Sequence, residues 1–378
     1  MYFRNVIGQQ EIKEKLQREK AEGRIAHALL FSGTPGSGTL ALALAYARYL
    51  LCESPGKEEA CGQCPACRRM DKFLNPDLHF VYPVLKRNAQ AKTEDTTSAV
   101  WDREWRDFIA QSPYTDLNRW IRFMDKKGQA MIYAAESNEI MRKIHIKSGS
   151  KNGYKVMIVW YPERMNAVCA NKLLKLLEEP PEKTVFLLVC AEPEKLLTTI
   201  ISRTQRIPVP RISEAELTEA LTAQFGLSTE AASATAHIAD GDFIKAIETI
   251  QASGEAEKHF QLFVELMRLA YTRKVRELKA WSEKLADMQR DQGKHFLIYC
   301  QRMVRENFIY NFRHPKMVYL NYNEQQFATR FAPFINENNC IGIMEELDLA
   351  QRHIEQNVNM KMIFFDLALR MTVLIKQR

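Results

Sequence analysis

The sequence predicts an α/β protein in which a parallel sheet with helices on both faces precedes an all-helical region. A glycine-rich loop joins the short apolar run "HALLF" to an Ala/Leu-rich segment, the order of a phosphate-binding strand–loop–helix unit. Two further apolar runs, 156–160 and 185–190, have the composition of strands buried on both faces. From Ser213 onward the apolar residues recur at the 3.6-residue period of helices, which places a domain boundary near 208–211.

The elements of the first half follow from local signals. An amphipathic helix over about 10–23 precedes a strand at 28–31, the glycine loop and a helix that starts at Thr39. The run "NKLLKLLEE" predicts a helix that stops before Pro180 and Pro181, because a helix interior needs the amide that proline lacks.

A polar and aromatic insertion lies at about 85–128. Trp101, Trp105 and Phe108 have helical spacing within it. We interpret this stripe as a local helix packed on the domain edge rather than as a platform for nucleic-acid bases, because aromatic stripes usually serve packing. The insertion is therefore assigned no chemistry.

The composition is that of an ordinary globular protein. The chain has 378 residues, of which 46% are hydrophobic and 26% charged, with a net charge of +7 that permits contact with nucleic acid or acidic partners. The charged opening residues do not form a signal peptide, and the longest apolar stretch, 39–51, contains Arg48 and is too short for a bilayer. We expect a cytoplasmic protein without disulfides or membrane contact.

The glycine loop keeps only part of a nucleotide site. Gly33, Gly36 and Gly38 have the places of backbone cradle residues in the G-x-x-x-x-G-K-[ST] motif. Thr39 stands where the phosphate-binding lysine belongs, and Leu40 stands where a hydroxyl would bind magnesium.

The second nucleotide element is also altered. The strand that should end in an acidic pair carries Trp160 and Tyr161, and Glu163 follows past the expected strand end. We therefore expect negligible ATP hydrolysis by this chain alone. The glycines are then explained either by the positive φ angles that the sharp strand-to-helix turn requires or by a residual, weak anion site at the helix N-terminus, and the sequence does not decide between the two.

Four cysteines in the segment 52–67 predict a structural metal site. Cys52, Cys61, Cys64 and Cys67 form C-x8-C-x2-C-x2-C, a set of thiolates that closes a tetrahedral zinc shell and leaves no position for water. Iron–sulfur ligation is the lesser alternative, and four unrelated thiols the least favoured. The remaining cysteines read as small core residues: Cys169, Cys190, Cys300 and Cys340.

Several motifs in order resemble one family. "HALLFSGTPGSG", the four-cysteine module, "NPDLHFVYP", "NKLLKLLEEPPEKTVFLLV" and "EPEKLLTTIISRTQ" are similar to the delta prime subunits of the bacterial DNA polymerase III clamp loader, within the AAA+ clamp-loader family. The resemblance covers about 5–80 and 130–250. The insertion has no counterpart, and the C-terminal region matches only as generic helices.

The resemblance implies an AAA+ domain at 1–208, a helical lid at 209–255 and a helical collar for oligomerisation at 256–378. It implies a rigid, non-hydrolysing member of a hetero-oligomeric ring that loads the sliding clamp onto primer-template DNA. Its expected partners are gamma/tau-type ATPase subunits and delta, with clamp and DNA contacted through the complex.

The resemblance also implies roles for particular residues. "ISRTQ" matches the family's S-R-C segment at Ser202 and Arg203 but departs from it at Thr204, and Arg203 becomes the candidate arginine finger for a neighbour's γ-phosphate. In the lid, Ile244 stands where active members have an arginine, and Lys245 points about 100° away on a helix.

Two other classes compete with this interpretation. One is a P-loop ATPase that is active on its own with unorthodox residues. The other is a zinc-containing DNA-binding module in which Arg68 and Arg69 contact phosphates. The mild basic excess and the lack of an obvious recognition helix disfavour the second.

Overall fold

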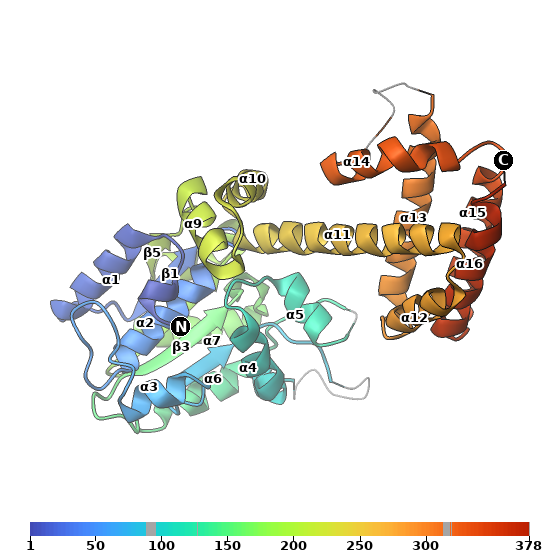
Figure 1. The fold of residues 1–378 in the computed structure, drawn as a ribbon. Coiled ribbons are helices and arrows are strands. Elements are labelled where there is room, and N and C mark those ends of the chain that lie inside the picture. The colour runs from blue at the N-terminus through green and yellow to red at the C-terminus, as the bar shows by residue number, and fades with distance from the viewer. Residues whose placement is uncertain (88–95, 127, 313–317, 319, 378) are drawn as a thin grey trace. The chain divides into compact units, whose positions relative to one another are not determined.

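The computed structural model divides into two compact units, Met1–Thr249 and Ile250–Arg378. The residues that it describes are 1–87, 96–126, 128–312, 318 and 320–377. The first unit contains a sheet with helices around it, and the described part of the second unit is helical (Figure 1). The finer division at 208/209 and 255/256 stays a prediction.

Five parallel strands form the sheet, in the order β2-β3-β4-β1-β5. β1 (Ala28–Ser32) pairs with the central strand, β4 (Thr184–Cys190), on one side and with β5 (Gln205–Pro208) on the other. β3 (Lys155–Trp160) lies between β4 and β2 (Leu78–Val81). The three strands predicted from apolar runs are confirmed, and the α/β class with them.

Helices cover both faces of the sheet, which is why β1, β3 and β4 are buried at every position. One face packs against α6 (Glu136–His145), α7 (Ala167–Glu178) and α8 (Thr198–Ile201) in a single buried cluster. α2 (Thr39–Leu51) contacts β1, β3 and β4 without joining that cluster, which places it on the other face. Apart from Thr39 and the buried Arg48, α2 consists of hydrophobic residues, and it is buried on all sides. The prolines at 180–181 follow α7, as predicted.

The described part of the insertion belongs to the core of the first unit. Within α4 (Asp102–Gln111) and α5 (Leu117–Phe123), Trp105 and Trp120 are completely buried. The Trp105 ring stacks on Tyr82 at 4.1 Å between ring centroids. The stripe therefore serves packing, as interpreted, although its rings are buried rather than at the edge of the domain. The predicted insertion also includes 88–95 and 127, which lie outside the described residues.

The remaining helices complete the two units. Those of the first unit are α1 (Gln10–Ala21), α3 (Pro65–Met70), α9 (Glu214–Phe225) and α10 (Thr229–Ala239). α11 (Phe243–Thr272) contains the boundary between the units. Those of the second are α12 (Val275–Ala286), α13 (Arg290–Tyr310), α14 (Tyr322–Phe331), α15 (Cys340–Glu355) and α16 (Met360–Leu374). Their apolar faces meet in one core around Phe263, Trp281 and Phe364. Among the described residues, no helix is both long and apolar enough to cross a bilayer.

Candidate functional site

The glycine loop lies between the end of β1 and the start of α2, as a phosphate loop would. The Gly33 amide donates to the Cys190 carbonyl at 3.2 Å, which ties the start of the loop to β4. The Ser37 hydroxyl closes the turn by donating to the Thr34 carbonyl at 2.8 Å. Gly36 and Gly38 both have positive φ, 84° and 94°, a conformation that glycine adopts without strain.

A carboxylate of the same chain covers the middle of this loop. A Cβ atom on Gly36 would lie 1.8 Å from Oδ1 of Asp242, so only glycine fits beside that side chain. The Phe243 amide donates to the Gly36 carbonyl at 3.2 Å, and Asp242 Oδ1 accepts the amide of Ile244 at 2.8 Å. Asp242 thereby caps the start of α11 and holds it on the loop. Burial raises the pKa of the Asp242 carboxyl.

A tyrosine from the insertion covers the end of the loop. The Tyr114 ring contacts Gly38, where a Cβ would lie 3.1 Å from its Cε1, and it packs on Phe243 with ring centroids 4.8 Å apart. Its hydroxyl accepts the Ile7 amide at 2.7 Å. Tyr114 is 4% exposed, and burial raises its pKa. The ring therefore joins the N-terminal segment, the glycine loop and α11.

The side chain of Gln9 also holds the loop in place. Its side-chain amide donates to the carbonyls of Ser37 at 3.2 Å and Pro210 at 2.7 Å. Thr39, at the first position of α2, brings no charge, and Leu40 is buried. The loop is thus held by neutral groups and faced by a carboxylate, an arrangement that opposes phosphate binding through like charge.

The end of β3 carries Trp160, and Glu163 follows it. Trp160 is buried and packs on Trp105, with ring centroids 5.0 Å apart. Glu163 lies beyond the strand in a short 3-10 turn, and its Oε1 accepts the amides of Ala191 at 2.8 Å and Glu192 at 3.0 Å. Oε1 of that carboxylate is thus bound to the backbone just after β4, while Oε2 is buried and accepts no hydrogen bond from a described residue.

The position compared in the sequence with the lid arginine of active members lies near the start of α11. Ile244 is buried, and the adjacent Lys245 is exposed. The structure therefore brings no described arginine or lysine of this segment onto the glycine loop.

Arg203 lies just after α8, apart from the glycine loop, and its side chain is 36% exposed. Its Nη2 pairs with Oε1 of Glu178 at 2.7 Å, and Nη1 donates to the Thr199 carbonyl at 3.0 Å. Both partners belong to its own chain. An ion pair as exposed as this one contributes at most about 1 kcal/mol, so the guanidinium can exchange Glu178 for another anion.

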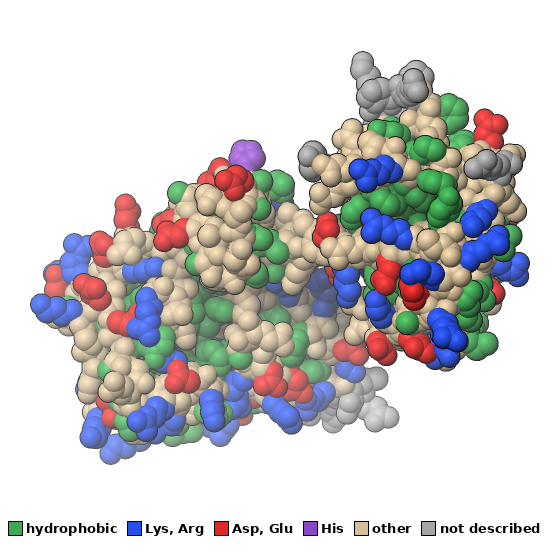
Figure 2. All heavy atoms as spheres, in the orientation of Figure 1, with side chains coloured by type: hydrophobic (Ala, Val, Ile, Leu, Met, Phe, Trp, Pro, Cys, Tyr) green, Lys and Arg blue, Asp and Glu red, His purple; other side chains and the backbone are tan. Residues whose placement is uncertain are grey.

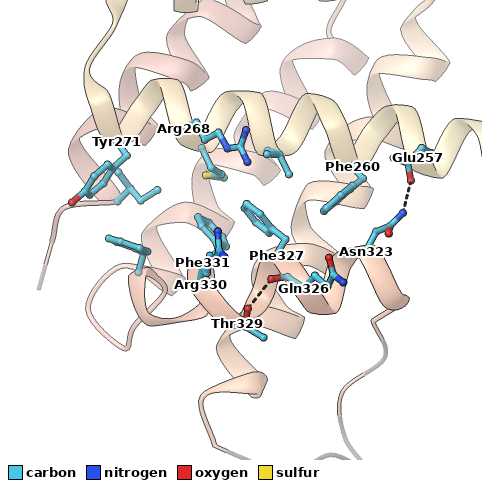
Figure 3. Close-up of a pocket in the computed structure, with 14 residues that line it drawn as sticks. Glu257, Phe260, Arg268, Tyr271, Asn323, Gln326, Phe327, Thr329, Arg330 and Phe331 are labelled. Atoms are coloured by element: carbon cyan, nitrogen blue, oxygen red, sulfur yellow. Dashed lines mark hydrogen bonds between the residues drawn. The ribbon is translucent and has the colours of Figure 1, made fainter.

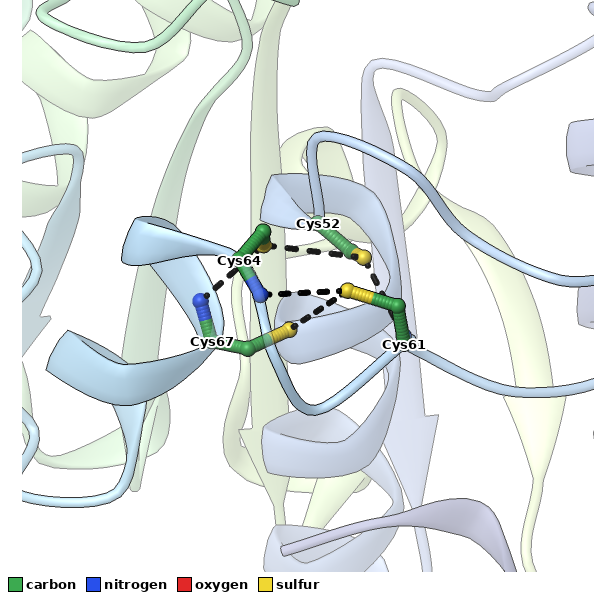
Figure 4. Close-up of side chains that lie close together, drawn as sticks. All are labelled: Cys52, Cys61, Cys64 and Cys67. Carbon is green, nitrogen blue, oxygen red and sulfur yellow. Dashed lines mark hydrogen bonds between the residues drawn. The ribbon is translucent and has the colours of Figure 1, made fainter.

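The four predicted cysteines meet in space (Figure 4). Their sulfurs all lie within 4.8 Å of one another, and the Cys52–Cys64 and Cys61–Cys67 pairs are 4.0 Å apart. Sulfurs bound to zinc at about 2.3 Å are about 3.8 Å apart in a tetrahedron, so the cluster fits such an ion with little change. All four cysteines are free of disulfides.

Backbone amides orient these sulfurs. The amide of Cys61 donates to Cys52 Sγ at 3.3 Å, that of Cys64 to Cys61 Sγ at 3.4 Å, and that of Cys67 to Cys64 Sγ at 3.4 Å. Donors of this kind favour thiolates, the form that binds metal, whereas burial raises the pKa of Cys52 and of Cys67. Backbone hydrogen bonds from Gln63 and Cys64 lower the pKa of Cys61 to about 6.

Two cations lie beside the cysteines. Arg48 is buried in α2, donates to the Cys67 carbonyl at 3.4 Å and pairs with Asp71 at 2.6 Å. Burial lowers the pKa of Lys20 to about 8, while the nearby sulfurs of Cys52 and Cys67 oppose that shift. Both cations would offset the negative charge that four thiolates leave on a divalent ion bound there. Arg68 and Arg69 lie on the six-residue α3, the former exposed.

Sequence reasoning missed Tyr114, Asp242 and the buried role of Arg48. The insertion offered no motif for the tyrosine. An aspartate just before a helix is an N-cap signal, and it could have drawn attention to Asp242.

The family match found among known proteins lies within the first unit. A family model described as "DNA polymerase III, delta subunit" matches residues 8–213. The chain is 30% identical over 189 residues to DNA polymerase III subunit delta' of Yersinia pestis, covering 50% of this chain and 43% of that one. It is 31% identical to the delta' subunit of Escherichia coli K12 over 192 residues, covering 50% and 44%. The matched part spans less than half the length of these relatives.

The comparisons also found a tau subunit and two solved structures. The chain is 28% identical over 211 residues to DNA polymerase III subunit tau of Bacillus subtilis, covering 56% of this chain and 29% of that one. Among solved structures it is similar to the Thermotoga maritima RuvB Holliday junction branch migration motor, with 17% identity, a TM-score of 0.37 and coverage of 65% and 62%. A gamma subunit-related protein of DNA polymerase III from Thermotoga maritima has 15% identity, a TM-score of 0.31 and coverage of 96% and 99%. The family assignment rests on the match over 8–213.

Proposed function

Because this chain belongs to the DNA polymerase III delta subunit family, in its delta'-type branch, we propose that it is a non-catalytic subunit of a clamp-loader complex. In this role it contributes to ATP-dependent loading of the sliding clamp onto primed DNA as a rigid ring member. Its partners are gamma/tau-type ATPase subunits and delta, and it meets the clamp and primer-template DNA through the complex.

The observation that carries the non-catalytic role is the covered glycine loop. Phosphoryl transfer needs a cation at the phosphates and a carboxylate that organises magnesium. Here Thr39 is neutral, Glu163 is engaged by backbone amides, and Asp242 and Tyr114 lie against the loop glycines. A nucleotide would have to displace two side chains of the chain itself before binding.

The active contribution is assigned to Arg203. A guanidinium supplied in trans neutralises charge that develops on a transferring γ-phosphate. Arg203 is partly exposed and is held by Glu178 in a pair that is easily exchanged. We propose that a neighbour's γ-phosphate replaces Glu178 as its partner in the assembled ring.

The four cysteines are proposed to hold a structural zinc ion. All four positions of a tetrahedral shell are filled by protein thiolates, so the ion has no open position for substrate or water. The ion would hold the segment between α2 and α3 in place, because the apolar core of that segment is small and consists mainly of the cysteines themselves.

The test uses the complex reconstituted with the tau-type and delta subunits of the same organism. Arg203→Ala should silence the one ATPase site that this chain flanks, because a missing arginine finger lowers turnover about a thousandfold or more at its site. DNA-stimulated ATPase of the whole complex then falls by that site's share. Arg206→Ala removes an exposed arginine three residues away and should leave the rate unchanged.

Glu178→Gln frees Arg203 without removing it and should keep the rate at or above the wild-type value. An unchanged rate with Arg203→Ala overturns the finger role. ATP hydrolysis by the isolated chain, lost in a Gly38→Ala variant, overturns the non-catalytic role and favours an active P-loop enzyme.

A further inference from the structure

A groove on the C-terminal unit has no role in the function proposed above. It lies between the second half of α11 and α14, and its volume is about 910 Å³ (Figure 3). All of its lining residues belong to the second unit. A second hollow of similar volume continues it past Tyr271, Phe334 and Ile375, which line both.

The floor of the groove is a ladder of aromatic rings. Phe260 meets Phe327 edge-on at 5.8 Å between centroids, and Phe327 stacks on Phe331 at 4.7 Å. The ladder continues through Phe334 to Tyr271, whose rings are 5.0 Å apart. Tyr271 is 46% exposed and Phe334 38% exposed. A continuous apolar strip of this kind is a typical site for a partner chain.

Two arginines line this strip from opposite helices. Arg268 belongs to α11 and Arg330 to α14, and both are exposed (Figure 3). Neither forms an ion pair with a carboxylate among the described residues. Lys376 adds a third cation over the Tyr271 ring, at 5.2 Å from its centroid. Figure 2 shows hydrophobic side chains of this unit gathered between basic ones.

The acids of the lining stand apart from these cations. Glu257 lies at the far end, where the Asn323 amide donates to it at 3.4 Å, and Glu337 lies in the continuation. The aromatic strip is therefore edged by positive charge that no described carboxylate neutralises. Charge complementarity calls for an occupant that is apolar on one face and negative along the border of that face.

We propose that the groove binds an acidic amphipathic helix of another protein chain, with its apolar side chains on the ring ladder and its carboxylates on Arg268 and Arg330. Arginine and aromatic residues are enriched where binding energy concentrates in protein interfaces. A hollow between two helices accepts a third helix by the same packing that joins helices in a bundle.

A nucleic acid fits this surface less well. Phe327 and Phe331 stack on each other and present edges rather than free faces for bases, and Phe331 is buried. The groove also offers only a few cations and ends at Glu257, where a phosphate backbone would meet a like charge.

The experiment uses the full chain and a pair of synthetic helical peptides. Both carry leucines at heptad a and d positions; one has glutamates at the flanking e and g positions and the other has lysines there. Binding of the fluorescein-labelled peptides is measured by anisotropy. The glutamate peptide should bind about tenfold more tightly than the lysine peptide, because two exposed ion pairs supply roughly that factor.

Charge variants separate this groove from general attraction. Arg268→Gln with Arg330→Gln should abolish the preference, and Arg268→Glu with Arg330→Glu should reverse it. Arg276→Glu changes an exposed arginine of α12 that does not line the groove, and it should leave both affinities unchanged. Circular dichroism and thermal melting confirm that each variant is folded.

Three results overturn the proposal. The first is equal binding of the two peptides, or no binding of either. The second is loss of the preference in Arg276→Glu to the same degree. The third is tight binding of oligothymidylate that the groove variants abolish, which would assign the groove to single-stranded nucleic acid.

Discussion

Replacing Tyr114 tests the statement that the chain covers its own glycine loop. Its ring contacts Gly38 and Phe243, and its hydroxyl accepts the Ile7 amide at 2.7 Å. Ile7 is itself 7% exposed, so its amide has no easy access to water. Tyr114→Phe removes only this hydrogen bond, and Tyr114→Ala also empties the space between the loop and α11.

The two variants should lose different amounts of folding stability. A buried amide that loses its acceptor destabilises a protein by about 1–3 kcal/mol, which we expect for Tyr114→Phe. Truncating a buried aromatic ring costs about 3–5 kcal/mol, which we expect for Tyr114→Ala. Domains are stable by only about 5–15 kcal/mol, so the second variant should unfold at markedly lower denaturant concentration.

Urea unfolding followed by tryptophan fluorescence measures both effects. Four of the five tryptophans lie in the first unit and report on it: Trp101, Trp105, Trp120 and Trp160. Tyr133→Phe is a matched control, because the Tyr133 hydroxyl makes no hydrogen bond to a described residue and Tyr133 belongs to the same unit. That control should change the free energy of unfolding by less than about 0.5 kcal/mol.

The same variants should not create an ATPase. Thr39 brings no cation and Asp242 still faces Gly36, so Tyr114→Ala leaves the electrostatic obstacle in place. Two results would refute the reasoning. Equal stability of Tyr114→Phe and the wild-type chain would show that the Ile7 contact contributes nothing. Tight binding of Mg·ATP by the wild-type chain, unaffected by Tyr114→Ala, would show that the ring does not occupy the site.

The other predictions concern the loop carboxylate, the metal and the missing lysine. Burial raises the pKa of Asp242, so the folded chain keeps that proton to higher pH than the unfolded chain and loses stability as the pH rises through the folded pKa. The Asp242→Asn variant lacks this titration, so its free energy of unfolding should increase relative to that of the wild-type chain between about pH 4 and about pH 7. Urea unfolding of both proteins at the two pH values measures this difference. Cys64→Ser should lower the zinc content measured by mass spectrometry below one equivalent and should destabilise the first unit by several kcal/mol. Cys340→Ser, which lies outside the cluster, should have neither effect. A wild-type chain that is fully stable without metal would contradict the zinc assignment. Thr39→Lys should still fail to bind Mg·ATP in calorimetry, because Asp242 and Tyr114 remain; submillimolar binding would show that the loop is open.

Much of the fold could be predicted because it depends on local patterns. The strands at 156–160 and 185–190 are apolar throughout, and the sheet buries them on both faces. The cysteine cluster could be predicted for the same reason, since four ligands within sixteen residues can reach one ion without knowledge of the tertiary fold.

The covered loop could not be predicted, because it depends on contacts between segments far apart in the sequence. Tyr114 belongs to an insertion without a recognisable motif. Asp242 lies just before a helix that follows the last strand of the sheet in the sequence. The contacts of Arg48 could not be predicted for a similar reason. Its charge marked the apolar stretch 39–51 as unfit for a membrane, but its ion pair with Asp71 and its place beside the cysteines appear only in the folded chain.

The retained glycines are explained by these contacts without any nucleotide. A Cβ at position 33 would lie 2.5 Å from the Val209 carbonyl oxygen, one at 36 would overlap Asp242, and one at 38 would press on Tyr114. Each glycine of the loop is thus required by a neighbour within the same chain, even though the lysine and the acidic pair are gone. A loop fastened to α11 in this way has no need to open and close with each turnover. Arg203 lies outside these contacts, after α8, so the role proposed for it toward an adjacent subunit does not depend on whether the glycine loop is open.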